Sequence, residues 1–304
     1  MVMNRSQSAK AGVPLQLFDP RRGGVAVKTQ PVESGSFGQP QRFNYVTMLW
    51  IQEGQGSFCV DLEEHAFQAP GLLFANPYQT FFLCPESELA GTCLQFHANF
   101  LCIETYHEEI GCNGVLFNDV YGLPVVRVEA PQAAEFALLS RQIEDELNTA
   151  GLAHSEILLS YLKVFLIKAT RSKLAGRKQL AKAATGQMPP LLERLIELIE
   201  THYQSQLGPL DYAARLHITP KALGRLVKTH FGKSLTLLIR ERTLKHAKWQ
   251  LLHTRQPVKE VAAGLGFADE FYFSRLFKRS TGLSPSAFRE FETAIRGGRN
   301  LSMQ

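Results

Sequence analysis

The chain has 304 residues, of which 45% are hydrophobic and 20% are charged. This composition is too apolar for a disordered chain, and the length allows two folded domains. No apolar run approaches the ~20 residues that a membrane helix needs, and residues 1–12 lack the apolar core of a signal peptide. We therefore expect a cytoplasmic protein that does not bind a membrane.

The formal net charge of +5 is divided unevenly along the chain. Residues 1–172 contain 11 Lys and Arg against 18 Asp and Glu, a charge of −7. Residues 173–304 contain 22 against 10, a charge of +12. Lys and Arg that neutralise phosphates supply much of the affinity of a protein for nucleic acid, although ordinary solvated surfaces carry them too. The second part is therefore the one expected to meet a polyanion.

Short strands separated by turn residues are predicted between residues 43 and 100. Their expected positions are residues 44–51, 57–62, 72–75 and 79–84, with Glu63 and Glu64 among the turn residues between them. Strands of this length and spacing favour an antiparallel barrel or a jelly roll. Both alternating faces of residues 44–51 are mostly apolar, so we expect this strand to be covered on both sides.

Beyond Pro131 the apolar period lengthens from two residues to about three and a half, which indicates helices. Residues 134–147 predict an amphipathic helix, and residues 157–166 predict a second, more apolar one. The wide apolar surface of the second helix favours a dimer contact, with an intramolecular core as the alternative.

Residues 173–188 lose the apolar period and gain Lys, Gly and Ala, which predicts a linker that ends at Pro189 and Pro190. We therefore divide the chain into an N-terminal domain over residues 12–172, this linker, and a C-terminal domain over residues 189–304.

The C-terminal region is helical by pattern and contains an internal repeat, Leu210–Phe231 and Val258–Thr281. In each copy a short segment with paired alanines leads through a tight turn to a longer helix, which ends in a basic stretch and a glycine. Small residues allow the longer helix to cross the shorter one closely. This order of features is typical of a helix-turn-helix unit.

Capping residues locate the longer helix of each repeat. Thr219 precedes Pro220 at the start of one helix, and Asp269 begins the other. Each helix then directs its apolar residues inward and leaves an arginine, Arg225 or Arg275, on the outer face. An exposed arginine can bind guanine through two hydrogen bonds in the major groove.

One long amphipathic helix is predicted between the repeats, over Leu235–Leu252. At ~1.5 Å per residue it would span roughly 27 Å, which suits two successive major grooves ~34 Å apart. One chain could then read both grooves.

The segment GFADEFYFSRLFKRSTGLSPSAFR, residues 266–289, resembles the signature of the AraC/XylS transcriptional regulators. The sequence is similar to that family throughout from Pro189, over about 110 residues. The N-terminal part is similar to the cupin-like sensing domain of the family through WIQEGQGSFCVD, residues 50–61, and LFANPYQ, residues 73–79.

The resemblance implies an α+β protein: a cupin-like β-barrel with two helices, followed by an all-α domain of seven helices with two helix-turn-helix units. It also implies a ligand-responsive and usually dimeric activator of a neighbouring operon. The expected partners are double-stranded DNA, a small-molecule effector, RNA polymerase and a second copy of the chain.

The resemblance assigns base contacts to both units. They fall to Lys221 and Arg225 in the first unit and to Glu270, Phe271, Ser274 and Arg275 in the second. The basic residues Lys228, Lys278 and Arg279 are expected to contact phosphates, which alters affinity rather than sequence choice. Gly224 departs from the family pattern, because it offers no side chain at a base-contact position and weakens its helix by ~1 kcal/mol.

Sugar-binding members of the family use polar and aromatic groups at positions that correspond here to Asn44, Phe82, Gly91 and Cys93. Most of that polar set is missing from this chain. We therefore expect an apolar or aromatic effector rather than a sugar, with Met48 as a further candidate for lining its pocket.

An enzyme of the metal-dependent cupin type is the main alternative for the N-terminal part. It would need clustered His and Glu ligands, whereas His65, His97 and His107 form no H-x-H pair. No Gly-rich nucleophile turn precedes a Ser or a Cys. We therefore expect no enzymatic activity, no catalytic residue, no metal and no cofactor.

The five cysteines, all in the acidic part, leave a second alternative open. They show no C-x-x-C spacing, and buried free thiols are the favoured interpretation. A regulator that senses oxidants through them is the alternative. The residues concerned are Cys59, Cys84, Cys93, Cys102 and Cys112.

Overall fold

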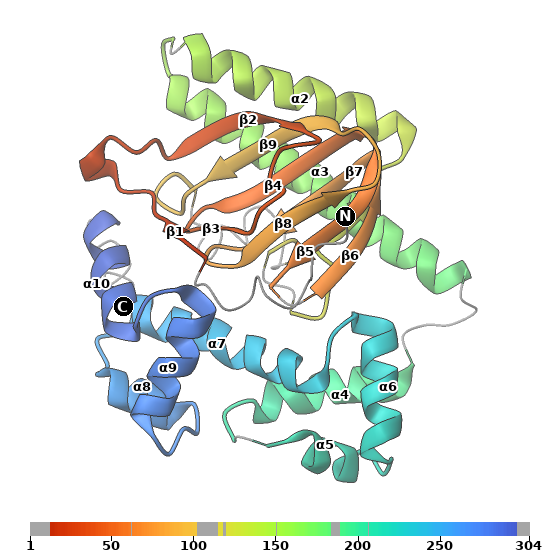
Figure 1. Cartoon of the computed structure of the whole chain (residues 1–304), viewed down its shortest axis with the longest axis vertical. Helices are drawn as coiled ribbons and strands as arrows, with labels where there is room; N and C mark the ends of the chain where they lie inside the picture. Colours follow the sequence, from red (N-terminus) through yellow and green to blue (C-terminus); the bar gives the residue numbers. More distant parts are fainter. Residues whose placement is uncertain are drawn as a thin grey trace.

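The computed structural model describes residues 13–61, 63–101, 115–117, 120–149, 151–183, 189–205 and 207–296. A part rich in β-strands with two long helices is followed by a helical part (Figure 1). This arrangement confirms the predicted α+β class. Among these residues, no helix is long and apolar enough to cross a membrane.

The strands form two five-stranded sheets whose neighbours are antiparallel, apart from the parallel pair β1 and β3. In spatial order, the first sheet contains β1 (Leu15–Gln16), β3 (Gln41–Phe43), β8 (Thr80–Pro85), β5 (Gln55–Val60) and β6 (Glu63–Gln68). The second contains β10 (Val125–Arg127), β7 (Gly71–Ala75), β4 (Val46–Glu53), β9 (Ala90–Phe96) and β2 (Val27–Glu33). A short 3-10 helix, η1 (Pro20–Arg22), follows β1.

The four predicted strands are present as β4, β5, β7 and β8, with ends shifted by up to two residues. The prediction that Glu63 and Glu64 form a turn is wrong. The chain turns at Asp61, where φ is 54°, and Glu63 begins β6. Buried and exposed residues alternate along β6, but the sequence does not show this as an apolar and polar alternation because the buried residues include Glu63 and His65.

Strand β4 is buried on both faces, as predicted. Leu49 and Ile51 belong to the core between the two sheets, which we call the sheet core. Met48 and Trp50 belong to a second core, in which the ring of Trp50 lies 5.5 Å from that of Phe136. Alternation along the strand therefore divides its side chains between two apolar layers.

The second core lies under the helices α2 (Ala130–Thr149) and α3 (His154–Ala183), which pack on one sheet (Figure 1). Both predicted helices are thus present. Residues 173–183 of the predicted linker are helical and continue α3. Lys, Ala and Leu favour helix over this stretch, and the lone Gly176 opposes it by only ~1 kcal/mol.

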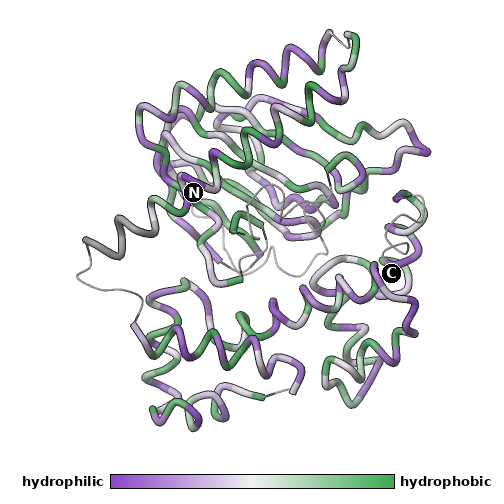
Figure 2. Tube along the Cα trace, turned by 180° about the vertical axis from the view of Figure 1, so that it is seen from behind, coloured by the Kyte–Doolittle hydropathy of each residue, from purple (hydrophilic) through white to green (hydrophobic). Residues whose placement is uncertain are grey.

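Seven helices follow among the described residues. They are α4 (Pro190–His202), α5 (Pro209–Arg215), α6 (Pro220–Phe231), α7 (Leu235–His253), α8 (Val258–Gly264), α9 (Glu270–Thr281) and α10 (Pro285–Ile295). Figure 2 shows hydrophobic and hydrophilic residues alternating along these helices, which is the pattern of amphipathic helices around a shared interior. A single apolar cluster, which we call the helix core, runs from α4 to α10.

Candidate nucleic-acid interface

Helix α6 is held at both ends by local signals. The hydroxyl of Thr219 accepts a hydrogen bond from Ala222 N at 3.2 Å, and Pro220 fills the first turn. At the other end Gly232 adopts the left-handed conformation with φ 73°, which glycine reaches without steric cost. Leu223 and Val227 bury the inner face of the helix between these ends.

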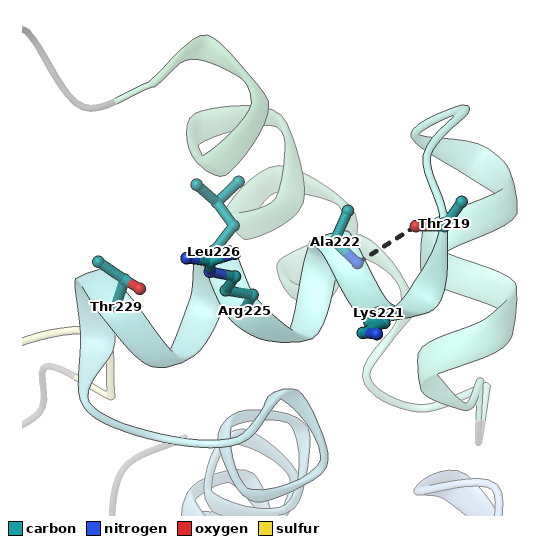
Figure 3. A pocket seen from close by; sticks show the side chains of 6 residues that line it. All are labelled: Thr219, Lys221, Ala222, Arg225, Leu226 and Thr229. Carbon is teal, nitrogen blue, oxygen red and sulfur yellow. Dashed lines mark hydrogen bonds between the residues drawn. The ribbon is translucent and has the colours of Figure 1, made fainter.

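The outer face of α6 is basic and open to solvent. Lys221, Arg225 and Thr229 line an open pocket of about 470 Å³ with Leu226 along one side of the helix (Figure 3). Lys228 is exposed too, and its ammonium donates to the carbonyl oxygen of Gly232 at the end of the helix. This surface offers cations without a neighbouring carboxylate among its lining residues.

Helix α9 repeats the same construction fifty positions later. The carboxylate of Asp269 accepts hydrogen bonds from Phe271 N at 2.8 Å and Tyr272 N at 3.2 Å. Gly282 closes the helix in the left-handed conformation with φ 86°. The buried residues are Phe273, Leu276, Phe277 and Thr281.

The outer face of α9 combines aromatic and cationic groups. Phe271 is 76% exposed and Tyr272 is 51% exposed, which is unusual for side chains of this size. The side chain of Arg275 is 74% exposed, and its guanidinium lies 3.9 Å from a carboxylate oxygen of Asp269, the residue that also caps the helix. Asp269 thus helps to orient Arg275 toward the N-terminal end of α9.

The two units lie toward opposite ends of α7 (Figure 1). Since α7 has 19 residues, it spans roughly 28 Å at ~1.5 Å per residue. This length is close to the ~34 Å between successive major grooves on one face of DNA.

Seven of the nine predicted DNA-contact residues are exposed on the outer faces of α6 and α9. Glu270 and Ser274 are half-buried on the same face of α9. Two further residues on these faces are not predicted from the sequence: Thr229, which lines the pocket, and the exposed Tyr272. The sequence holds a signal for both. Thr229 is at the position of the repeat that corresponds to Arg279, and Tyr272 immediately follows Phe271.

The predicted effector residues do not converge on one pocket. Met48 faces α2 and α3, and Phe82 lies between Phe81 and Leu83, which point into the sheet core, so its own side chain points to the opposite face. Asn44 is buried, but its amide exchanges hydrogen bonds with the backbone of Phe18, at 2.7 Å from the N–H and 3.4 Å to the carbonyl.

Of the four predicted effector residues Asn44, Met48, Phe82 and Cys93, Cys93 is therefore the one whose side chain lies in the sheet core. Burial raises the pKa of its thiol to about 12, which keeps it protonated and unreactive at neutral pH. Gly91 lies in the same strand as Cys93 and packs against the backbone of Trp50.

No group of three or more His, Cys, Asp or Glu that could hold a metal occurs in the part of the chain that the structure describes. Cys59, Cys84 and Cys93 form no disulfide bond there. Three other residues considered for metal or redox chemistry lie outside the described residues: Cys102, Cys112 and His107.

Comparison with known proteins agrees with this architecture. Residues 212–290 match the model of a helix-turn-helix domain. The arabinose operon regulatory protein of Escherichia coli (strain K12) is 34% identical over 105 residues, 33% of this chain and 36% of that protein. The HTH-type transcriptional activator RhaR of Enterobacter sp. (strain 638) is 25% identical over 173 residues, 57% of this chain and 60% of that protein.

The chain thus spans between 36% and 60% of the length of these curated relatives. Among solved structures, the C-terminal domain of AraT, a response regulator from Geobacillus stearothermophilus, is 30% identical. The matched region covers 34% of this chain and 88% of the AraT domain, with a TM-score of 0.33.

Two capped helices of matching design, each crossing a shorter helix, define a tandem helix-turn-helix protein. The C-terminal region of the chain is similar to the helix-turn-helix regulators of the AraC/XylS family.

Proposed function

We propose that the chain is a sequence-specific DNA-binding regulator of transcription in which α6 and α9 read two successive major grooves. The observation that carries this proposal is the repetition of one device. Each helix has a capped N-terminus, a glycine at its end and an exposed arginine at the same position, Arg225 or Arg275. A solvated surface helix does not require such a repetition fifty residues apart.

The charge distribution supports the same function. The C-terminal part carries the net positive charge of the chain, and phosphate neutralisation drives the affinity of such surfaces for DNA. Arg225 and Arg275 act by base readout, joined by Lys221, Glu270, Phe271 and Ser274. Lys228, Lys278 and Arg279 contact phosphates and fix the register.

Selection from a pool of random DNA duplexes by the full chain tests this function. We expect an enriched site with two conserved blocks whose centres lie about one helical turn apart, ~10 base pairs. The double variant Arg225→Ala/Arg275→Ala should no longer enrich it. Arg127→Ala, an exposed arginine of β10, is the matched control and should enrich the same site. A pool without any common sequence after selection would refute the proposal.

We also propose that the N-terminal part is a cupin-like sensing domain that controls DNA binding through a small apolar or aromatic effector. An apolar effector would suit the sheet core, because the side chains around Cys93 include those of Phe58, Phe67 and Phe81. Thermal-shift screening of the full chain against metabolites tests this, since a ligand that binds the folded state raises the melting temperature. Only ligands that also change the affinity for the selected DNA site support the proposal.

A homodimer that activates transcription with RNA polymerase in the cytoplasm completes the proposed function. Apolar side chains left exposed on α2 and α3 support a dimer contact there: Leu138 is 56% exposed and Val164 is 41% exposed. Light scattering of the wild type should give twice the mass of one chain, and Leu138→Glu should give the mass of one. A monomeric wild type at micromolar concentration would refute this contact.

A further inference from the structure

The N-terminal part and the helical part each place a side chain in an apolar core of the other. Tyr78, which precedes β8, is buried in the helix core, where its ring lies 5.1 Å from that of Phe288. In return Ile295, at the end of α10, is buried in the sheet core. The two parts therefore share apolar interior rather than touching only at their surfaces.

A buried carboxylate joins the two parts at α10. Glu292 is 1% exposed and accepts hydrogen bonds from the hydroxyl of Tyr78 and from Arg296 Nε, the latter at 2.9 Å. His97 Nε2 of the N-terminal part lies 3.7 Å from the second carboxylate oxygen. Asn99 Nδ2 donates to the carbonyl of Ile295 at 2.6 Å.

Burial alone would raise the pKa of Glu292, but these partners outweigh it and hold the pKa below its ordinary value of 4.5. The contact at α10 is therefore a charged, hydrogen-bonded anchor. Removing a partner would leave a buried charge unpaired, which is strongly unfavourable.

A second anchor lies where α6 ends. Lys233, which follows the closing glycine of α6, is buried with its ammonium 3.6 Å from Glu63 of β6 and 2.7 Å from Glu241 of α7. Glu63 also contacts His65 at 3.2 Å. A Cβ built on Gly232 would lie 3.6 Å from Cε1 of the same histidine, so the end of α6 rests on β6.

The end of α9 meets the N-terminal part at the equivalent position. A Cβ built on Gly282 would lie 3.2 Å from Cδ2 of Leu15 and 3.3 Å from Nη1 of Arg42. Lys248, between the two units on α7, donates to the carbonyl of Pro77 at 3.4 Å. Both recognition helices therefore end against the N-terminal part, each at its closing glycine.

We propose that the N-terminal part is a brace that fixes the spacing and orientation of α6 and α9, with Glu63 and Tyr78 as positioning residues. This inference rests on the proposed DNA-binding function. A single helix such as α7 can bend and twist, which would change the distance between α6 and α9. Contacts of both units with the N-terminal part restrict this movement. The contacts leave the side chains of Lys221, Arg225 and Arg275 exposed, so the brace does not cover these three cations.

The test uses substitutions confined to the N-terminal part, so that the DNA-reading helices keep their sequence. Glu63→Gln/Tyr78→Phe removes the charge that faces Lys233 and the hydroxyl that faces Glu292, with almost no change in volume. Glu53→Gln is the control, because it removes the charge of a carboxylate in the N-terminal part that is exposed at the end of β4. Each protein is measured as the full chain.

The probes are duplexes that carry the two selected blocks at spacings changed by one to five base pairs, and a duplex with one block. Linked readers gain affinity only when their geometry allows both to bind, so the wild type and the control should lose at least about tenfold in affinity away from the preferred spacing. For the double variant, the affinity should differ by less than about threefold between spacings. It should bind the preferred probe more weakly than the wild type does and bind the one-block probe with the same affinity as the wild type.

Two results would overturn the brace. One is a double variant that keeps the sharp spacing preference of the wild type. The other is a double variant that binds every probe more tightly, because the contacts would then inhibit DNA binding. Circular dichroism checks that the variant is folded, and Tyr78→Phe alone replaces the double variant if it is not. A wild type that binds no DNA contradicts the proposed function instead.

Discussion

The two helix-turn-helix units show how much of a recognition helix is fixed and how much is free to vary. Thr219 and Asp269 cap the two helices, and Gly232 and Gly282 end them in the same left-handed conformation. These positions are fifty residues apart in both pairs. The ends of the helix therefore determine which residues point outward, whatever those residues are.

The inner and outer faces differ between the units. Inside, the second unit replaces Leu223 and Val227 with Phe273 and Phe277, whose rings lie 5.8 Å apart. Outside, the first unit presents small or flexible residues such as Gly224, whereas the second presents exposed aromatic rings. If the proposed function holds, we expect the second unit to be the better anchored and to read more of the DNA.

Core truncation gives the largest expected difference between the units. Phe277→Ala should lower the free energy of unfolding by about 3–5 kcal/mol, because it removes a fully buried ring and leaves a cavity. The equivalent Val227→Ala removes two methyl groups and should cost roughly 2 kcal/mol. Urea unfolding of the full chain, followed by circular dichroism, measures both. Equal losses would contradict the stronger anchoring of the second unit.

The exposed arginines give the next largest effect. Arg275→Ala and Arg225→Ala should each cost about 1–3 kcal/mol of discrimination at one base position. The larger loss is expected for Arg275, since Asp269 orients its guanidinium.

Lys278→Ala and Lys228→Ala are the matched controls. They should weaken binding evenly across sequences and lower the slope of log affinity against log salt by about one. Gel shifts on the selected site and on single-base changes separate the two patterns. Even losses for all four variants would mean that neither arginine reads a base.

Removal of the two N-cap side chains should change the free energy of unfolding by a smaller amount. Loss of an N-cap side chain costs about 0.5–2 kcal/mol. Asp269→Ala should lie near the upper end of this range, because the carboxylate accepts two backbone N–H groups and carries a charge that favours a helix N-terminus. Thr219→Ala should lie near the lower end, since its hydroxyl accepts one. A larger loss for Thr219→Ala in the same urea experiment would contradict this order.

Local signals explain why the C-terminal half could be predicted from the sequence. Caps, helix-ending glycines and the repeat of paired alanines act within a few residues, so the helices and their exposed faces follow directly. Periodicity likewise predicts the two helices over residues 134–147 and 157–166. Helix propensity continues where the apolar period fades, and α3 accordingly extends through Ala183.

Long-range contacts explain what could not be predicted. Alternation shows that Met48 and Leu49 face opposite sides of β4, but both sides are apolar, so the pattern does not say which side is the sheet core. Strand β6 is hidden because Glu63 and His65 are buried against a segment more than 160 residues away, beside Lys233. The anchor at Glu292 depends on Tyr78 in the same way.

Gly224 gives the smallest expected effect and the most direct test of what separates the two outer faces. A Cβ built at this position meets nothing within 4 Å, and the backbone is helical. Gly224→Ala should therefore raise the free energy of unfolding by about 0.5–1 kcal/mol, because alanine loses less conformational freedom than glycine on entering a helix. Ser274→Ala, at the equivalent position of α9, should change it by roughly 0.5 kcal/mol or less.

The same pair distinguishes stability from DNA reading. If glycine leaves one base position unread, Gly224→Ala should stabilise the protein without altering its preferred sequence, whereas Ser274→Ala should relax the preference at one position. Unfolding in urea and selection from random duplexes measure the two properties separately. A changed sequence preference for Gly224→Ala would instead mean that the bare backbone of α6 approaches the DNA there, and that the first unit reads by close fit what the second reads with side chains.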